Sequence, residues 1–230
     1  ISSMKSSLFR SLWSLHLITP RGFIRLLRCF LHEGITMMAA VRFAARYHAH
    51  ECAVVSDNQR IDYQDFYAFA KKLSYVLYHE YQLRSGQHVA LFCRNHLVSA
   101  LLLPALSRLG VNVKLLNTDL SNEQLLQLMS RPFAFFIYDK ELLQVENIDI
   151  TCPQVSCESL LETIKEQLLT DNVVLPYIKR GGNISVMTGG SSGNYKEAAR
   201  QTGIVQFLPP FFSLLRDLHI DSYQSVLIGL

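Results

Sequence analysis

Residues 184–196 read ISVMTGGSSGNYK: a short β-prone apolar run enters a turn rich in glycine and hydroxyl residues, and a lysine follows. Glycine permits positive φ and lets the backbone approach a ligand closely. Successive exposed N–H groups in such a turn form a concavity that binds anions. Hydroxyl groups add small donors, and a lysine adds a mobile positive charge. The stretch therefore favours the binding of a polyphosphate, although a flexible Gly/Ser-rich loop is the commoner alternative.

Three standard motifs can be compared with this turn. The Walker pattern requires a lysine directly after its last glycine, but two residues intervene before Lys196. The dinucleotide pattern G-x-G-x-x-G fails on its spacing. Residues 189–193 do match G-x-S-x-G, the nucleophile elbow of hydrolases, with Ser191 in the nucleophile position. That fold needs a later acid and histidine, and only Asp217 and His219 follow, so a serine hydrolase is a weak alternative.

The composition of the 230-residue chain is that of a folded protein. Hydrophobic residues make up 49% and charged residues 18%, which is enough for a core in one large or two small domains. The net charge of +3 is uneven, because residues 1–50 carry a net charge of +6 and the remainder a net charge of −3. No array of basic and aromatic residues indicates nucleic acid, so no nucleic-acid partner is predicted.

The cysteines and the apolar runs bear on the compartment. The five cysteines are Cys29, Cys52, Cys93, Cys152 and Cys157. Their odd number and the lack of C-x-x-C argue against a disulfide framework or zinc site and favour reduced thiols in a cytoplasmic protein. Cys152 and Cys157 have no histidine near them in sequence, and no metal site is predicted. No run of about 18 apolar residues indicates a membrane span, and residues 2–17 do not resemble a signal peptide.

Residues 1–50 are predicted to form a basic, helical N-terminal segment ahead of a domain in residues 51–230. One apolar helix face is formed by Phe23, Leu26, Leu27, Phe30 and Leu31, and Gly34 marks the end of this helix. A basic amphipathic helix can lie on an anionic membrane, so peripheral membrane association is one interpretation. Packing of this face against the body of the protein is the commoner case.

The middle of the chain alternates predicted strands with predicted helices. Strands are expected at 52–56, 61–63, 89–93, 111–116 and 133–138, and helices at 97–109 and 121–129 and after Asp62. Further on, 159–169 and 204–218 are predicted helices, and 225–228 begins another strand. Asp62 and Ser121 are expected as helix caps. The alternation predicts an α/β fold with a mostly parallel sheet flanked by helices, and the final strand suggests an incomplete fold from a longer protein.

Residues 188–197 resemble the phosphate-binding motif T-S-G-[ST]-T-G-x-P-K-G of the adenylate-forming (AMP-binding) enzymes, which include acyl-CoA synthetases. The matching residues, aligned without gaps, are Thr188, Gly190, Ser191, Gly193 and Lys196, and Ser192 exchanges one hydroxyl for another. Gly189, Tyr195 and Glu197 stand where the family has Ser, Pro and Gly. Residues 83–91 resemble the family's segment G-V-x-x-G-D-x-V-A-I, after which Asn95 is expected to open a helix. The resemblance runs from about Cys52 to the end of the chain.

The resemblance implies a two-step acid–thiol ligase. A carboxylate, with a fatty acid favoured, would attack ATP in the presence of Mg²⁺, and a thiol such as CoA would take the acyl group from the acyl-adenylate. Thr188, Gly189, Gly190, Ser191, Ser192, Gly193 and Lys196 would bind the nucleotide; no catalytic residue and no metal ligand is identified in this fragment. The family's later motifs are not found, so the fragment alone is expected to be inactive. A non-catalytic relative that binds a nucleotide or partner is the alternative, motivated by Gly189 and Glu197.

Overall fold

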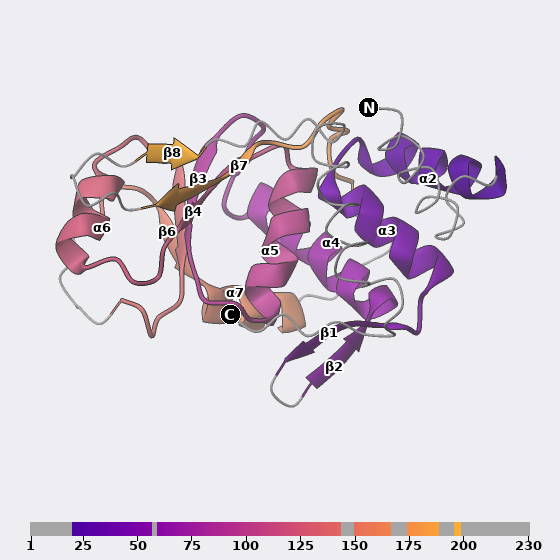
Figure 1. Ribbon diagram of the computed structural model, residues 1–230, viewed down its shortest axis with the longest axis horizontal. Helices are drawn as coiled ribbons and strands as arrows, with labels where there is room; N and C mark the ends of the chain where they lie inside the picture. The colour runs from indigo at the N-terminus through magenta and orange to yellow at the C-terminus, as the bar shows by residue number, and fades with distance from the viewer. Residues whose placement is uncertain (1–19, 57–58, 144–149, 167–173, 189–195, 199–230) are drawn as a thin grey trace, which may run out of the picture. The chain divides into compact units, whose positions relative to one another are not determined.

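The computed structural model describes residues 20–56, 59–143, 150–166, 174–188 and 196–198. The chain divides into two units, Ile1–Arg28 with Gln201–Leu230, and Cys29–Arg200. Only Pro20–Arg28 is described in the first unit, and it forms the first part of a helix. The second unit contains all other described elements (Figure 1). The predicted helix at 204–218 and strand at 225–228 lie outside the described residues.

Two helices open the described part of the chain. α2 spans Pro20–Glu33 and α3 spans Met37–Tyr47. Gly34 ends α2 with φ of 72°, and its N–H donates to the Phe30 carbonyl, as expected for a left-handed glycine after a helix. The apolar face predicted for α2 is wrong at Leu27 and Leu31, which are 46% and 66% exposed, whereas Glu33 is buried. Glu33 points inward and forms ion pairs with Arg42 and Arg108.

A small antiparallel hairpin precedes the longest helix. β1 (Cys52–Ser56) pairs with β2 (Gln59–Asp62), and α4 follows over Tyr63–His79. Asp62 caps α4 as predicted, since its carboxylate accepts the Asp65 N–H at 2.8 Å. Helix α4 buries an apolar stripe that includes Phe66, Leu73 and Leu77, and the helix predicted after Asp62 is confirmed.

The predicted α/β fold with a mostly parallel sheet is confirmed. In the described residues the sheet has the order β6-β5-β3-β4-β7-β8, and only the β7–β8 pair is antiparallel. Its strands are β3 His88–Phe92, β4 Asn112–Leu116, β5 Phe135–Tyr138, β6 Gln154–Ser156, β7 Ile184–Thr188 and β8 Lys196–Ala198. The helices between them are α5 Leu97–Arg108, α6 Asn122–Met129 and α7 Cys157–Glu166. Ser121 caps α6 through a capping box, as predicted.

Apolar side chains cover both faces of the central strands. Because successive side chains of a strand point to opposite faces, β3 contributes to two cores. Val89 and Leu91 pack in the larger core with α4, α5 and α7, whereas Ala90 and Phe92 pack in the smaller core with α6. Figure 1 shows α6 apart from the group formed by α3, α4 and α5. Two covered faces explain the continuous apolar runs that the sequence shows in β3 and β5.

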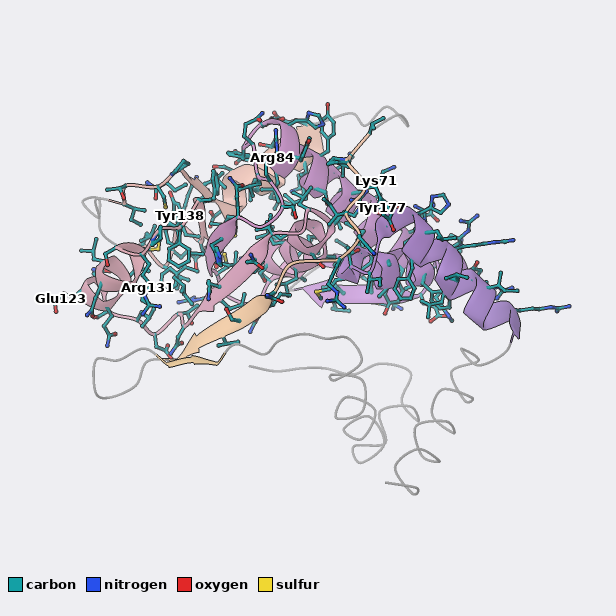
Figure 2. All side chains as sticks on the ribbon, turned by 90° about the horizontal axis from the view of Figure 1, so that it is seen from above. Lys71, Arg84, Glu123, Arg131, Tyr138 and Tyr177 are labelled. Atoms are coloured by element: carbon teal, nitrogen blue, oxygen red, sulfur yellow. The ribbon has the colours of Figure 1, made fainter. Side chains whose placement is uncertain are left out.

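In Figure 2, Glu123 and Arg131 lie at the end of the second unit that carries α6, and Lys71 and Tyr177 lie farther along the unit, away from α6. Within the residues that the structure describes, no helix is both long enough and apolar enough to cross a membrane.

Two elements at the edges of the sheet were not predicted, and one cap was predicted wrongly. β6 and β8 have three residues each, too few to show a period of two. Helix α7 begins at Cys157, two residues before the predicted start. Asn95 does not open α5, because His96 is its N-cap.

Candidate functional site

The β7–β8 hairpin carries the predicted phosphate-binding turn. β7 lies parallel to β4, and β8 returns antiparallel to β7, so that Thr188 and Lys196 are cross-strand partners in the backbone. Residues 189–195, which contain Gly189, Gly190, Ser191, Ser192 and Gly193, lie outside the described residues. The predicted strand at the start of the turn is confirmed, and the roles of the individual residues stay predictions.

The turn leaves the sheet at the carboxyl end of β7. Because β3, β4, β5, β6 and β7 are parallel, their carboxyl ends lie at the same edge. Ligands of open parallel α/β sheets bind at this edge. The hairpin therefore has a position at which a ligand-binding loop is expected.

A second feature of this edge is the reversal of strand order between β3 and β5. The chain passes from β3 to β4 on one side of β3 and later reaches β5 on the other side. Such a reversal is a topological switch point, where the loops after the two strands diverge and leave a crevice. The residues that follow the two strands there are Cys93–His96 after β3 and Asp139 after β5.

His96 and Asp139 are joined by a hydrogen bond at this switch point. The Nδ1 atom of His96 accepts the N–H groups of Val98 and Ser99 at 3.1 and 3.3 Å and so caps α5. Its Nε2 lies 2.7 Å from Oδ1 of Asp139, whose Oδ2 accepts the Arg94 N–H at 2.6 Å. These bonds fit a neutral ring that carries its hydrogen on Nε2, a tautomer assigned from the hydrogen bonds.

The protonation of His96 is subject to opposing effects. Contact with the Cys157 sulfur, and then with the Asp139 carboxylate, raises the pKa of His96 to about 9 despite its partial burial. A second proton on Nδ1 would, however, face two N–H donors at the positive end of α5. We therefore take the neutral ring as the form that caps the helix.

Two thiols lie at the same switch point. Cys93 follows β3 and Cys157 begins α7, and their sulfur atoms are 3.1 Å apart. Both are free cysteines. Cys157 is 2% exposed, and its contact with Cys93, together with burial, raises the pKa of its thiol. Cys152 is closer to Cys157 in sequence, but the sulfur that lies beside Cys157 is that of Cys93.

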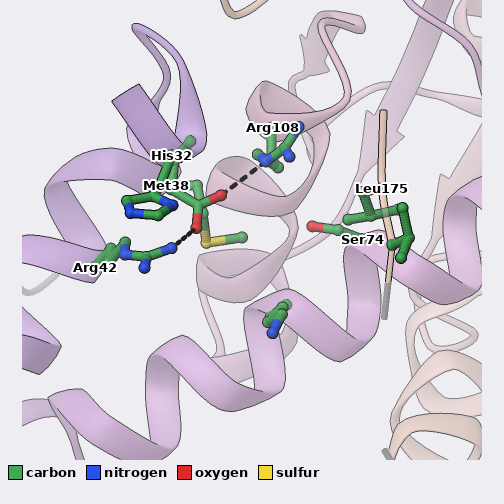
Figure 3. A pocket seen from close by; sticks show the side chains of 9 residues that line it. His32, Met38, Arg42, Ser74, Arg108 and Leu175 are labelled. Carbon is green, nitrogen blue, oxygen red and sulfur yellow. Dashed lines mark hydrogen bonds and ion pairs between the residues drawn. The ribbon is translucent and has the colours of Figure 1, made fainter. Parts of the chain in front are cut away.

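A polar pocket of about 300 Å³ lies among α2, α3, α4 and α5. Glu33 is its central residue: Oε1 accepts from Nη1 of Arg42 and from the Tyr67 hydroxyl, each at 2.7 Å. Oε2 accepts from Nε of Arg108, also at 2.7 Å (Figure 3). Lys71 also lines the pocket. Glu33 therefore binds the guanidinium groups of both Arg42 and Arg108. These contacts form an internal ion network that joins α3, α4 and α5 to the end of α2.

The network predicts a pH dependence of stability. Although burial opposes it, hydrogen bonds from Tyr67, Arg42 and Arg108 lower the pKa of Glu33 below the ordinary value of 4.5. A lowered folded-state pKa adds stability above the unfolded-state pKa, and this stability is lost as the pH falls through the folded-state value. We expect Glu33→Gln to flatten the decline in unfolding free energy below pH 4.5, measured by urea titration. The prediction is contradicted if the unfolding free energy falls equally steeply with pH in Glu33→Gln and in the native chain. Glu51→Gln, which changes an exposed glutamate, is the control.

No protein-family model and no curated protein matches this sequence. Solved structures do match its fold. O-succinylbenzoate CoA synthetase (MenE) from Bacillus subtilis, in complex with AMP, superposes with a TM-score of 0.62 and 19% identity, over 77% of this chain and 45% of that chain. The N-terminal subdomain of NpsA from Klebsiella oxytoca, in complex with 3-hydroxybenzoyl-AMSN, superposes with a TM-score of 0.56 and 18% identity, over 72% of this chain and 40% of that chain.

A third similar structure is the inhibitor-bound N-terminal domain of FACL13 from Mycobacterium tuberculosis, with a TM-score of 0.61 and 20% identity over 72% of this chain and 44% of that chain. The three proteins are adenylate-forming, acyl-CoA synthetase-like enzymes. This chain spans less than half the length of each matched structure. The predicted resemblance is thus confirmed in fold: the chain is folded like the N-terminal subdomain of an adenylate-forming enzyme.

Proposed function

We propose that this chain is the nucleotide-binding N-terminal part of an ATP-dependent acid–thiol ligase. The ligase would activate a carboxylate, with a fatty acid as the favoured substrate, as an acyl-adenylate and transfer it to a thiol such as CoA. The observation that supports this most is the β7–β8 hairpin, which joins Thr188 to Lys196 at the carboxyl edge of the parallel sheet. The fold likeness adds support, since the matched MenE structures contain AMP, or ATP and magnesium.

The residues of the turn would act by orientation and charge stabilisation. Backbone N–H groups of residues 189–193 and the hydroxyls of Thr188, Ser191 and Ser192 would donate to the β- and γ-phosphates. Lys196 would stabilise the negative charge that develops on the departing pyrophosphate. Donors that are fixed before the reaction would need little reorganisation as the bond to the α-phosphate breaks.

Mg²⁺ is a hard cation that prefers oxygen ligands. The metal-ligating group that the described residues bring together consists of two sulfurs and one carboxylate oxygen, from Cys93, Cys157 and Asp139. This donor set does not fit Mg²⁺, and no step is assigned to a magnesium ion held there. In the proposed reaction Mg²⁺ would be bound through the phosphates of ATP.

Replacing Lys196 tests the proposal. We expect Lys196→Ala to weaken MgATP binding to the 230-residue chain by about tenfold, the loss of one charged contact worth about 1.4 kcal/mol. Isothermal titration calorimetry measures the affinity. Lys165→Ala is the matched control, because this exposed lysine lies in the last turn of α7, away from the hairpin. Equal affinities of Lys196→Ala and the control, or no nucleotide binding by the native chain, would contradict the proposal.

The non-catalytic alternative is distinguished by restoring the family residues. If Gly189 and Glu197 weaken the turn, the variant Gly189→Ser/Glu197→Gly gains MgATP affinity, because a donor is added and a like charge beside the phosphates is removed. A gain would favour a nucleotide-binding relative with a weakened turn. Labelling of Ser191 by a fluorophosphonate probe would instead favour a hydrolase.

A further inference from the structure

The cluster at the β3–β5 switch point is separate from the phosphate-binding hairpin, because β4 lies between β3 and β7. One sulfur each from Cys93 and Cys157 and one carboxylate oxygen of Asp139 all lie within 4.8 Å of one another. They come from three positions far apart in sequence: the end of β3, the end of β5 and the start of α7. The proposed ATP chemistry uses none of them.

Their donor types are those of a soft cation site. Thiolates select Zn²⁺ or Cu⁺ over Mg²⁺ and Ca²⁺, and Zn²⁺ also accepts carboxylate oxygen. With Zn–S bonds of about 2.3 Å in a tetrahedron, two sulfurs lie roughly 3.8 Å apart. The sulfurs of Cys93 and Cys157 are 3.1 Å apart, so they would separate by roughly 0.7 Å. Cys93 is only half-buried, and rotation of its side chain can supply this movement.

His96 is placed to orient the carboxylate ligand. Its Nε2 donates to Oδ1 of Asp139, and the Arg94 N–H donates to Oδ2, so both carboxylate oxygens are held and each keeps a further lone pair. Direct ligation by His96 Nε2 would move its hydrogen to Nδ1, where it would oppose the N–H groups of α5. His96 therefore fits the role of a positioning residue beside the metal.

The electrostatic surroundings suit three anionic ligands around a divalent cation. Cys157 is the first residue of α7 and His96 is the cap of α5, so the positive ends of two helices meet at the cluster. Asp139 is 5% exposed, and burial strengthens its attraction to a cation. His96 is 31% exposed and leaves a route from solvent.

We propose that Cys93, Asp139 and Cys157 form a binding site for a thiophilic divalent cation, with Zn²⁺ as the best fit, water as the fourth ligand and His96 holding Asp139 in place.

A disulfide between the two thiols is the main competing interpretation. Formation of that bond needs an oxidant that takes up two electrons, and both cysteines are free in the structure. Binding of a divalent cation needs no oxidant, because the cation takes the place of the thiol protons. The disulfide also gives Asp139 and His96 no part in the chemistry.

Zinc titration of the full chain tests the proposal. The protein is reduced, freed of metal with a chelator, and titrated with Zn²⁺ in competition with a chromophoric chelator. We expect one equivalent to bind, and Co²⁺ in its place to give thiolate-to-cobalt charge-transfer absorption. Bound Zn²⁺ should also slow alkylation of Cys93 and Cys157, but not of Cys52, when the modified peptides are mapped by mass spectrometry.

Variants separate the ligands from their neighbours. Loss of a residue that only orients a metal ligand weakens metal binding by about 10–100-fold. Cys93→Ser and Cys157→Ser each remove a ligand itself, so each should weaken zinc binding by more than this. His96→Asn keeps an acceptor for the cap of α5 but loses the contact with Asp139, and should weaken binding by about 10–100-fold. Cys52→Ser and Cys152→Ser are the matched controls and should bind zinc like the native chain.

Three results would overturn the proposal. The first is no zinc uptake by the native chain beyond that of the Cys93→Ser/Cys157→Ser variant. The second is zinc uptake that leaves Cys93 and Cys157 as reactive toward alkylation as before, a measurement that needs no variant to fold. The third is a Cys93–Cys157 disulfide in protein purified without reductant, combined with no zinc uptake after reduction.

Discussion

Glu33→Ala is expected to lower the free energy of unfolding by about 3–5 kcal/mol, because it breaks a buried ion network. The alanine leaves the Arg108 guanidinium, 6% exposed in the native chain, without the carboxylate that accepts from its Nε. Arg42 and Tyr67 lose the same acceptor. A buried ion pair adds little net stability, but a buried charge without its partner is strongly destabilising. Removing one partner of the pair therefore has a large effect. Urea denaturation followed by circular dichroism measures the change.

Two further variants show whether the cost arises from the unpaired charge. Glu51 also lies 2.7 Å from a basic group, His48, but its side chain is 68% exposed. Glu51→Ala should therefore change the stability by less than about 0.5 kcal/mol. The double variant Glu33→Met/Arg108→Met removes both charges and should recover part of the loss of Glu33→Ala. A loss for Glu33→Ala as small as that for Glu51→Ala would contradict a buried network.

Gly34→Ala is expected to cost more than about 4 kcal/mol or to prevent folding of the second unit. Gly34 has φ of 72°, and a Cβ at this position would overlap the carbonyl oxygen of Ile178. That oxygen belongs to backbone held in place nearby, since the Ile35 N–H donates to the Lys179 carbonyl at 3.0 Å and Ile35 accepts from Gly181 at 3.0 Å. Neither backbone can move away without breaking these bonds. Thermal and urea denaturation measure the loss.

Gly86→Ala is the matched control for this substitution. Gly86 also has positive φ, 85°, but an added Cβ would meet no atom within 4 Å. It should therefore cost only the about 1–2 kcal/mol of a left-handed alanine. The difference between the two variants measures the overlap with Ile178. Equal losses would show that Gly34 is needed for its backbone angle alone.

Local signals account for the elements that the sequence predicted well. Asp62 and Ser121 are common N-cap residues, and both cap a helix here through a bond to a residue three positions on. The apolar runs of β3 and β5 reflect two covered faces. His96 was missed as a cap because its ring accepts from α5 only in the tautomer that its contact with Asp139 favours. That contact spans 43 positions in the chain.

The candidate sites also differ in whether their residues are close together or far apart in the sequence. The glycine-rich turn and the strand before it were predicted from consecutive residues, although the turn itself lies outside the described residues. The Cys93–Cys157 pair joins residues 64 positions apart, and the Glu33–Arg108 pair joins residues 75 positions apart. No periodicity or short motif contains such pairs. The position of Asp139 directly after the predicted strand 133–138 was the one available signal, since parallel strands end at a common edge.

The sequence by itself determined where the central strands and most helices form, which residues cap α4 and α6, and that a strand precedes the glycine-rich residues 189–193. These features depend on hydrogen bonds and side-chain periods within a few residues. The tertiary structure alone decided which side chains meet across the fold. β5 lies on the side of β3 opposite to β4, so that Asp139 reaches His96, and Glu33 turns inward at the end of α2. Strand order and the rotation of a helix follow from the packing of whole faces against one another, to which residues throughout the chain contribute.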